Sequence, residues 1–473
     1  MEINGAKMFV KALQEEGVDT LFAYPGGTAI DLFDALYDAE GIDMILPRHE
    51  QALVHAADGY ARSTGRVGVC LVTSGPGATN LVTGIATANY DSVPLVCFTG
   101  QVPMNLIGND AFQEVDIVGI TRSICKYAVT VRKREDLARI IKNAFYIART
   151  GKPGPVVVDI PKDIQLAMGS DEYPSEVNIR GYKPSEGVHV GQIKRALAEL
   201  KNAKKPVFLC GGSVNIAHAR KEMQQLAEKT GIPVVTTIMG KGAIPTDHPL
   251  YVGNIGMHGN LASNKAIMES DVLFSIGCRF NDRITGTIDT FAKNAKIIHV
   301  DIDAASISRN IKVDIPIVAD AKVAISKMLE YAEPLDIKDW VDDIMNVKAE
   351  YPINMNRYDG VTPEAIIRTI NDMYSNLIIT TDVGQNQLWT TQFFDIETNR
   401  QLLTSGGLGT MGYGFPAAIG AKIGNPERPV IAISGDGGMQ MNIQEFATAM
   451  VYELPVIVVV FNNGYLGNVR QWQ

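Results

Sequence analysis

The chain has 473 residues, of which 46% are hydrophobic, and a formal net charge of −9 at pH 7. A chain of this length exceeds one hydrophobic core and predicts about three domains. The acidic balance argues against a broad nucleic-acid-binding surface, although a local cluster of cations could still hold a small anion. The longest apolar runs, such as residues 455–461, have the length of a strand and are too short to span a membrane.

The cysteines and the first residues indicate the compartment. None of the five cysteines forms a C-x-x-C pair, and each lies in or beside an apolar stretch, which predicts buried, reduced thiols. The first 17 residues are acidic in part and have helical periodicity, so we expect no secretory signal. These features predict a cytoplasmic protein.

Short apolar strands alternate with amphipathic helices from the start of the chain. In the first block we expect helices at 30–39, 50–65 and from about Leu81, between strands at 20–24, 43–47, 67–73, 94–99 and 155–163. Strands of the second block are expected at 206–212, 232–237, 271–277 and 296–303. Those of the third block are expected at 376–384, 428–435 and 455–461. This alternation predicts mostly parallel sheets covered by helices.

Two crossings divide the blocks. Residues 173–190 are rich in Pro, Gly and Ser, and a charged crossing follows residues 318–340. We therefore predict an α/β chain of three doubly wound domains, at 1–172, 188–335 and 360–473. Because so little follows the strand at 455–461, the third domain is expected to be incomplete at its C-terminal end.

The stretch SGDGG at 434–438 and the Asn-Asn pair at 462–463 follow two of these strands. A right-handed crossover brings both to the same edge of the sheet. Asn442 and Glu445 match a capping box, which predicts a helix that begins just past the loop. Carboxylate and amide oxygens suit Mg²⁺, which takes its other ligands from phosphate and water. The alternative is a glycine-rich turn and a polar strand end without a ligand.

This GDG followed by Asn-Asn resembles the motif of thiamine-diphosphate enzymes, in which Mg²⁺ anchors the diphosphate of the cofactor. The resemblance implies three metal ligands: Asp436, Asn463 and the carbonyl of Tyr465. The segment GGLGTMGYG at 406–414 is similar to the part of the family that bends the cofactor, with Met411 between the two rings and the Gly409 carbonyl accepting from the 4′-amino group. The remaining implied contacts to the cofactor are Gly384, Gln385, Asn386, Gly435, Gly437 and Gly438.

The same resemblance assigns a role to Glu50, in PRHEQ at 47–51. At this place the family has an acid that hydrogen-bonds the pyrimidine ring and promotes its imino form. A glutamate at a helix start is commonly only a favourable charge beside the helix dipole, and we take the neighbouring His49 as structural. In the family Glu50 and Asp436 would come from different subunits, which implies a homodimer or homotetramer.

Within this superfamily the chain resembles the catalytic subunit of biosynthetic acetolactate synthase over nearly its whole length. The resemblance rests on AYPGGTAIDLFDAL, PRHEQ, TSGPGATNLVTGIATA, TGQVP, DAFQE, GKPGPVVVDIPKD, GMHG, RFNDR, TSGGLGTMGYG and NVRQWQ. It implies decarboxylation of pyruvate and transfer of the two-carbon hydroxyethyl unit to a second pyruvate or to 2-ketobutyrate. The products are 2-acetolactate or 2-aceto-2-hydroxybutyrate, for valine, leucine and isoleucine biosynthesis.

The substrates are 2-keto acids, whose carboxylates call for a few cations in an otherwise apolar pocket. By resemblance, Arg283 binds the carboxylate of the second substrate and Gln113 hydrogen-bonds the intermediate, while Trp472, which could equally be a core or interface residue, recognises the extra methyl of 2-ketobutyrate. The other implied residues of this pocket are Gly27, Phe112, Lys162 and Val469.

The middle domain has no G-x-G-x-x-G, so an NAD fingerprint is absent. In the family this domain holds FAD, which takes no redox part. The residues that match its groove are Lys152, Gly211, Gly212, Thr237, Met257, His258, Asp301 and Asp320.

Five residues depart from the usual family pattern, namely Thr28, Lys152, Asn281, Asn386 and Asn468. One alternative is a catabolic acetolactate synthase without FAD or another thiamine-diphosphate carboligase or decarboxylase. A second alternative, a non-catalytic paralogue, is disfavoured because Glu50, Asp436 and Asn463 are all present. The sequence leaves open whether a separate regulatory subunit binds.

Overall fold

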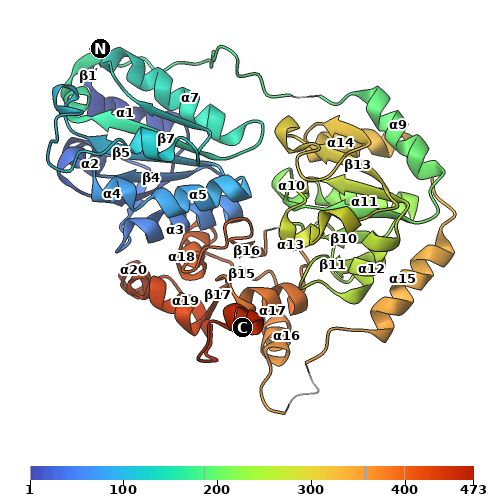
Figure 1. The fold of residues 1–473 in the computed structure, drawn as a ribbon. Helices are drawn as coiled ribbons and strands as arrows, with labels where there is room; N and C mark the ends of the chain where they lie inside the picture. Colours follow the sequence, from blue (N-terminus) through green and yellow to red (C-terminus); the bar gives the residue numbers. More distant parts are fainter. Residues whose placement is uncertain (1, 186, 356–358, 399) are drawn as a thin grey trace. The chain divides into compact units, whose positions relative to one another are not determined.

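The computed structural model describes residues 2–185, 187–355, 359–398 and 400–473, which form two compact units (Figure 1). The first unit comprises Met1–Lys183, Leu377–Gly384 and Leu403–Gln473. The second comprises Pro184–Asn376 and Gln385–Leu402. The chain therefore passes between the units four times, and one passage falls between Gly384 and Gln385.

A six-stranded parallel sheet forms the N-terminal part of the first unit, in the order β3-β2-β4-β5-β7-β6. Its strands are β2 (Thr20–Tyr24), β3 (Asp43–Ile45), β4 (Gly68–Val72), β5 (Leu95–Gln101), β6 (Tyr127–Thr130) and β7 (Pro155–Pro161). Its helices are α1 (Gly5–Glu15), α2 (Ile30–Tyr37), α3 (Glu50–Thr64), α4 (Pro76–Thr79), α5 (Val82–Asp91), α6 (Ile117–Thr121), α7 (Leu137–Arg149) and α8 (Lys162–Leu166). A short antiparallel pair, β1 (Glu2–Asn4) with β8 (Met168–Ser170), joins the two ends of this domain.

Alternate residues of each strand bury into opposite faces of this sheet. Leu21 and Leu71 lie in the core cluster with residues of α1 and α7, whereas Phe22 and Cys70 lie in the cluster with residues of α3 and α5. Successive side chains of a strand point to opposite faces, so a sheet covered on both sides needs apolar residues at nearly every position. This explains the continuous apolar runs in the sequence. Figure 1 shows helices on both faces of this sheet.

The C-terminal part of the first unit holds a four-stranded sheet in the order β16-β15-β17-β18. Its elements are β15 (Ile378–Thr381), β16 (Leu402–Thr404), β17 (Val430–Gly435), β18 (Val456–Phe461), α18 (Gly414–Gly424), α19 (Asp436–Met441), α20 (Phe446–Val451) and α21 (Gly467–Trp472). Strand β16 lies on one side of β15 and strand β17 on the other. The chain connections therefore run in opposite directions from β15. Ligands of doubly wound sheets bind at such a point, beyond the carboxyl ends of the strands.

Helices α3 and α18 pack against each other within the first unit. A Cβ built on Gly59 would lie 2.1 Å from the Ala417 carbonyl oxygen, and one on Gly420 would lie 1.8 Å from the Ala56 carbonyl oxygen. Both positions therefore require glycine, since no side chain fits between the two backbones. The helix that begins with Glu50 is thereby fixed to the helix that follows the segment 406–414.

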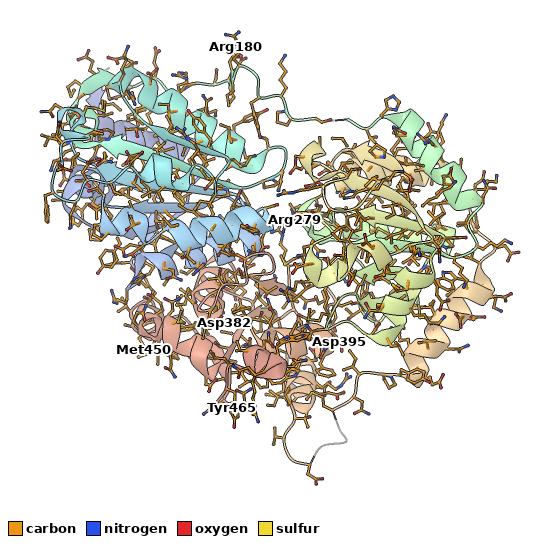
Figure 2. All side chains as sticks on the ribbon, viewed as in Figure 1. Arg180, Arg279, Asp382, Asp395, Met450 and Tyr465 are labelled. Carbon is orange, nitrogen blue, oxygen red and sulfur yellow. The ribbon has the colours of Figure 1, made fainter. Side chains whose placement is uncertain are left out.

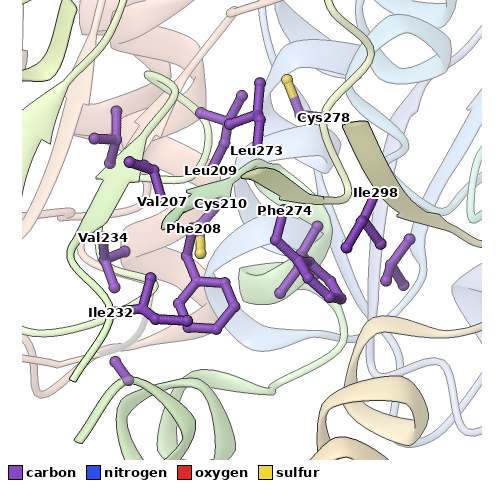
Figure 3. Packing of buried hydrophobic residues seen from close by; sticks show 14 of the residues in the cluster. Val207, Phe208, Leu209, Cys210, Ile232, Val234, Leu273, Phe274, Cys278 and Ile298 are labelled. Atoms are coloured by element: carbon purple, nitrogen blue, oxygen red, sulfur yellow. The ribbon is translucent and has the colours of Figure 1, made fainter. Parts of the chain in front are cut away.

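The second unit is built on a parallel sheet in the order β11-β10-β9-β12-β13-β14. Its strands are β9 (Pro206–Cys210), β10 (Val234–Thr236), β11 (Tyr251–Asn254), β12 (Val272–Ile276), β13 (Lys296–Asp301) and β14 (Ile315–Val318). Its helices are α9 (Val190–Lys201), α10 (Gly212–Ile216), α11 (Arg220–Thr230), α12 (Leu261–Glu269), α13 (Asp282–Thr285), α14 (Ala321–Tyr331), α15 (Lys338–Glu350), α16 (Pro363–Met373) and α17 (Gln385–Phe393). Figure 3 shows buried side chains of β9 and β12, among them Phe208 and Phe274. The ring centroids of these two residues lie 5.7 Å apart in an edge-to-face arrangement.

The predicted fold class is confirmed: three α/β domains, each with a parallel sheet at its centre. The sequence reading missed the strands β1, β6, β8, β11, β14 and β16. All six are three or four residues long. Their edge position or a neighbouring strand decides their pairing more than apolar content does. Within the described residues, no helix is long and apolar enough to cross a membrane. Four cysteines are buried, Cys125 is partly exposed, and all five are free thiols.

Candidate active site

The GDG loop and the Asn-Asn segment lie side by side at the carboxyl ends of β17 and β18. Gly435 and Phe461 are register partners, so the residues that follow them emerge together. The Asp436 carboxylate accepts from the backbone N–H groups of Gly464, at 3.1 Å, and of Gly437, at 3.0 Å. The Asn463 side-chain oxygen accepts from the Tyr465 N–H at 3.0 Å. The predicted strand–helix–strand unit and its shared edge are confirmed.

The donor set at this edge fits a magnesium ion that is shared with a phosphate. Asp436 supplies one carboxylate and Asn463 one amide oxygen, and these are hard oxygen ligands. Among the residues that the structure describes, no cluster of three His, Cys, Asp or Glu side chains could hold a metal on its own. A cation here would therefore take most of its ligands from the bound molecule and water.

The predicted capping box of Asn442 and Glu445 is wrong. Helix α19 begins at Asp436 itself, with Gly435 as its N-cap, and ends at Met441. The Asn442 amide donates to the Gly412 carbonyl at 2.6 Å, and Glu445 accepts from the Arg48 N–H at 3.0 Å. Both side chains serve contacts between distant segments, which no local pattern records.

The segment 406–414 turns back over the GDG loop. Gly409 and Gly412 have φ angles of +71° and +90°, values that a residue with a side chain rarely adopts. A Cβ built on Gly437 would lie 2.9 Å from the terminal methyl of Met411. Met411 thus projects to the first turn of α19, which begins with Asp436, and the resemblance assigns Met411 to the bend of the cofactor.

Asp382 is a site residue that the sequence reading missed. Its carboxylate is 1% exposed and accepts from the N–H groups of Gly412 and Val383, at 2.8 and 2.9 Å, and from the Ser434 hydroxyl at 3.2 Å. Burial raises the pKa of Asp382 to about 6, although these three donors lower it. One carboxylate therefore ties together the loop after β15, the loop before α18 and the end of β17. Figure 2 labels Asp382 in the C-terminal part of the first unit. Its position after an apolar strand was the available signal.

A buried charge network holds the start of the segment 406–414. The Arg62 guanidinium pairs with Asp58 at 2.6 Å and with Asp91 at 3.0 Å, and the Tyr413 hydroxyl donates to Asp58 at 2.7 Å. Asp91 also accepts from the N–H groups of Gly406 and Gly407, at 3.0 and 2.8 Å. Charged residues four apart on the buried helix α3 were the signal for this network, which the sequence reading did not use.

Glu50 begins α3, as predicted, and is half-buried. Its carboxylate accepts from the Asn80 amide at 2.9 Å, and a Cβ built on Gly77 would lie 3.4 Å from it. Residues 74–80 of the SGPGATN motif therefore surround this carboxylate on one side. His49 is the N-cap, and its ring accepts from the Gln51 N–H at 3.1 Å, which agrees with a structural role.

The loop after β2 meets the loop after β4 and the start of α8. The Thr28 hydroxyl lies 3.0 Å from the hydroxyls of Thr73 and Ser74 and accepts from the Ser74 N–H at 3.0 Å. The Lys162 ammonium lies 3.4 Å from the Gly27 carbonyl oxygen and 3.8 Å from Asp31. The structure thus brings together Gly27 and Lys162, two residues predicted for the substrate pocket.

Gln113 lies against the SGPG loop, because a Cβ built on Gly75 would be 2.8 Å from the Gln113 carbonyl oxygen. Gln113 itself has a φ of +59°. Phe112 beside it is 87% exposed, and Val469 and Trp472, on α21, are 54% and 68% exposed. The last three side chains therefore have no closed pocket around them within the first unit.

The remaining predicted residues lie in the second unit or at the passage between units. Gly384 has a φ of +127°, and Gln385 and Asn386 begin α17 in the second unit. Arg283, on α13, is exposed and pairs with Asp282 at 3.2 Å.

Most residues predicted for FAD lie past the strand ends of the middle sheet. Gly211 and Gly212 follow β9, and Thr237 follows β10. In this sheet β10 and β11 lie on one side of β9, whereas β12 to β14 lie on the other, so the chain connections run in opposite directions from the β9–β12 pair. A Cβ on Gly211 would lie 2.0 Å from the Gly277 carbonyl oxygen, so this glycine is needed for packing whether or not a ligand binds. The others at this edge are Met257, His258, Asp301 and Asp320, while Lys152 belongs to the first unit.

Family models of the thiamine pyrophosphate enzymes match all three parts of the chain. The N-terminal TPP binding domain matches residues 3–120, the central domain residues 193–328, and the C-terminal TPP binding domain residues 382–473. The class defined by the two sheet edges and these matches is that of the thiamine-diphosphate enzymes.

Closer relatives narrow the class. The chain is 49% identical to a probable acetolactate synthase large subunit of Methanococcus aeolicus and 50% identical to one of Methanocaldococcus jannaschii, in each case over 100% of this chain and 82% of the relative. It is 46% identical to the acetolactate synthase isozyme 3 large subunit of Escherichia coli, over 100% of this chain and 84% of that protein. The chain belongs to the family of acetolactate synthase large subunits.

Proposed function

We propose that this chain catalyses acetolactate synthesis with the cofactor anchored at the Asp436 edge and activated at Glu50. The substrates are pyruvate and a second 2-keto acid, either pyruvate or 2-ketobutyrate. The observation that carries the proposal is the contact of Asp436 with the segment 463–465, at the carboxyl ends of two adjacent parallel strands. That arrangement supplies hard oxygen ligands where the connections of the sheet diverge.

The residues of the first unit divide the work. Asp436, Asn463 and the Tyr465 carbonyl would hold Mg²⁺ and, through it, the diphosphate. Met411, whose terminal methyl lies beside Gly437, would support the bent form of the cofactor. Thiamine diphosphate, when bound, supplies the carbon nucleophile and the electron sink for decarboxylation. Glu50 holds a proton at the pyrimidine nitrogen, and Asn80 fixes the Glu50 carboxylate for that contact.

The substrate side uses residues from loops of the pyrimidine domain, from α21 and from α13. Lys162 beside Gly27 supplies a cation for a substrate carboxylate, Gln113 donates to the reacting oxygen, and Arg283 binds the carboxylate of the acceptor. Phe112, Val469 and Trp472 are exposed apolar side chains that line the acceptor pocket in the assembled enzyme.

The assembled enzyme is a homo-oligomer in which Glu50 of one chain meets Asp436 of another. A mixture of Glu50→Gln and Asp436→Asn chains tests this arrangement. In a dimer with shared sites, random exchange restores one of two sites in half of the dimers, about a quarter of wild-type activity. No recovery on mixing would place both residues in the site of one chain.

The middle domain binds FAD, which stays without a redox role, and Lys152 contributes to that groove. Support comes from the positions of the matching residues past the ends of parallel strands. The relatives are named large subunits, which implies a smaller partner chain. We propose that this protein also binds such a smaller regulatory subunit. Purified enzyme that releases flavin on denaturation and prefers 2-ketobutyrate over pyruvate as acceptor fits the biosynthetic enzyme. Full activity without flavin points to the catabolic type.

We further propose that the chain is divided into three domains, at 1–172, 188–335 and 360–473. We also propose that the protein is cytoplasmic. The decisive experiment measures acetolactate formation from pyruvate with and without thiamine diphosphate and Mg²⁺. We expect absolute dependence on both, and a loss of about 10²–10⁴-fold in kcat for Glu50→Gln. The matched control is Glu15→Gln, an exposed glutamate of α1, which should match the wild type. Activity without thiamine diphosphate overturns the proposal.

A further inference from the structure

Asp159 is a buried acid that the proposed reaction does not use. It lies on β7, between Thr99 of β5 and Thr130 of β6 in the register of the sheet, and is 2% exposed. Its carboxylate accepts from the Thr99 hydroxyl at 2.7 Å, the Thr130 hydroxyl at 3.1 Å and the Gln101 amide at 3.3 Å. Burial raises its pKa to about 7, with the nearby Asp116 acting in the same direction and these three donors acting against it.

A buried carboxylate such as that of Asp159 is costly within a sheet. Apolar residues of similar volume are commonly as stable as a buried charged group with its partners, so stability alone does not explain a carboxylate here. Buried acids with strongly shifted pKa values gather at functional sites. The contacts of Gln101 indicate which site.

Gln101 links Asp159 to the loop that carries Gln113. Its amide nitrogen donates to Asp159 and to the Val115 carbonyl, at 3.3 and 3.0 Å, and its side-chain oxygen accepts from the Val102 N–H at 2.9 Å. Both the nitrogen and the oxygen of the Gln101 amide are therefore hydrogen-bonded. A 180° rotation of the amide, which exchanges these two atoms, would lose all three hydrogen bonds. Asp159 fixes the orientation in which the nitrogen faces Val115.

The loop at 110–115, which ends at Val115, has a backbone conformation that needs support from its surroundings. Asp110 and Gln113 have φ angles of +50° and +59°, in the left-handed region that side chains disfavour. Within the loop, Gln113 packs on Gly75, and the Val115 carbonyl is held by Gln101. A residue in this conformation persists only where its surroundings hold it.

We propose that Asp159 and Gln101 are positioning residues, which hold the loop at 110–115 so that Gln113 faces the reacting groups. Asp159 orients the Gln101 amide, and the amide holds the loop at Val115. The inference rests on the proposed role of Gln113 in acetolactate synthesis. The two motifs TGQVP (99–103) and DAFQE (110–114) would then contribute to one site, because Gln101 of the first holds the loop that contains the second.

The test uses four variants of the full chain. Gln101→Met keeps the length of the side chain but none of its hydrogen bonds, and Asp159→Val removes the acceptor with a residue that suits a strand. Asp159→Asn keeps an oxygen that accepts from Gln101. Thr130→Val is the matched control, because it removes a donor to the same carboxylate without a link to the loop.

Two readouts are measured, the hydrogen exchange of a peptide that covers 104–116 and the kcat and KM for pyruvate. We expect faster exchange and a kcat lower by about 10–100-fold in Gln101→Met and Asp159→Val, with the affinity for thiamine diphosphate unchanged within about threefold. Asp159→Asn should recover most of the kcat, and Thr130→Val should resemble the wild type in both readouts.

A loss in Thr130→Val equal to that in Gln101→Met overturns the inference, as does Gln101→Met with unchanged exchange and unchanged kcat. If Asp159→Val does not fold, Gln101→Met against Thr130→Val decides. If the wild type makes no acetolactate, the proposed function fails, while the exchange of 104–116 still reports whether Gln101 holds the loop.

Discussion

The two sheet edges of the first unit are held together by different chemistry. At the diphosphate sheet, the carboxylates of Asp382 and Asp436 accept from backbone N–H groups of the surrounding loops. Where the loops after β2 and β4 of the pyrimidine sheet meet, hydroxyls do this work, with Thr28 joined to Thr73 and Ser74. In the proposed function the first edge holds a metal and a charged diphosphate, whereas at the second edge the Glu50 carboxylate holds a proton at a neutral ring. Neutral hydrogen bonds disturb that proton least.

This comparison predicts the largest effect at the charged edge. Asp436→Asn removes the one carboxylate of the proposed metal site, so we expect the affinity for thiamine diphosphate in the presence of Mg²⁺ to fall by at least about 100-fold. Titration of tryptophan fluorescence with the cofactor measures it. Asn462→Ala, at the exposed neighbour of Asn463, is the control and should bind normally. Equal losses in both variants would argue against Asp436 as the ligand.

The next effect concerns stability at the junction of the two domains. Arg62→Met leaves the buried carboxylates of Asp58 and Asp91 without their counter-charge, and removal of one partner from a buried ion pair costs about 3–5 kcal/mol. Denaturant unfolding should show this loss. Arg66→Met is the matched control, because the Arg66–Asp19 pair is about half exposed and worth less than about 1 kcal/mol. Similar losses for both arginines would contradict the assigned network.

The buried carboxylate of Asp382, at the diphosphate sheet, should make the stability of the folded protein depend on pH. Its pKa of about 6 in the folded state lies above the 3.8 of an exposed aspartate, so the folded protein binds this proton more tightly than the unfolded chain. Wild-type stability attributable to this group therefore falls as the pH rises from about 4 to about 6, by roughly 3 kcal/mol, and is constant above.

The variant Asp382→Asn removes this titration. The Tm of the variant minus that of the wild type should become more positive between pH 4 and pH 6.5, whatever the difference at pH 4. The exposed Asp289 provides the control variant Asp289→Asn, whose Tm difference should not change with pH in this window. A constant difference for Asp382→Asn would show that the carboxylate is not buried as described.

The smallest effect is expected at the hydroxyl edge. Thr28→Val keeps the shape of the side chain but removes the hydroxyl that contacts Thr73 and Ser74. We expect kcat/KM for pyruvate to fall by about 3–10-fold, in line with the loss of about one net hydrogen bond. Thr28→Ser keeps the hydroxyl and should stay within about twofold of the wild type. If serine and valine behave alike, the hydroxyl contacts do not position the Gly27 loop.

Local pattern sufficed for some parts of the site. The apolar strands predicted the sheets because both faces of each sheet are covered, and the loops after 430–435 and 455–461 had to emerge at one edge because parallel strands are joined by right-handed crossovers. Glu50 at the start of a helix was equally visible. These features depend only on residues close in the sequence and on general rules of chain connection.

Other residues could not be assigned from the chain alone. Asn442 and Glu445 looked like a capping box, but the folded chain gives them Gly412 and Arg48 as partners. Asp382 and Asp159 are single acids after or within apolar strands, and their meaning depends on which loops meet them.

The sequence by itself determined the three α/β domains, the central strands of their sheets and the residue types at the two cofactor edges. The tertiary structure decided which buried acids hold which loops, since these hydrogen bonds join segments up to hundreds of residues apart. Asp91 and Gly407, for example, are separated by 316 positions yet form one 2.8 Å hydrogen bond. A buried carboxylate is tolerated only with donors around it, and only the folded chain shows where those donors lie.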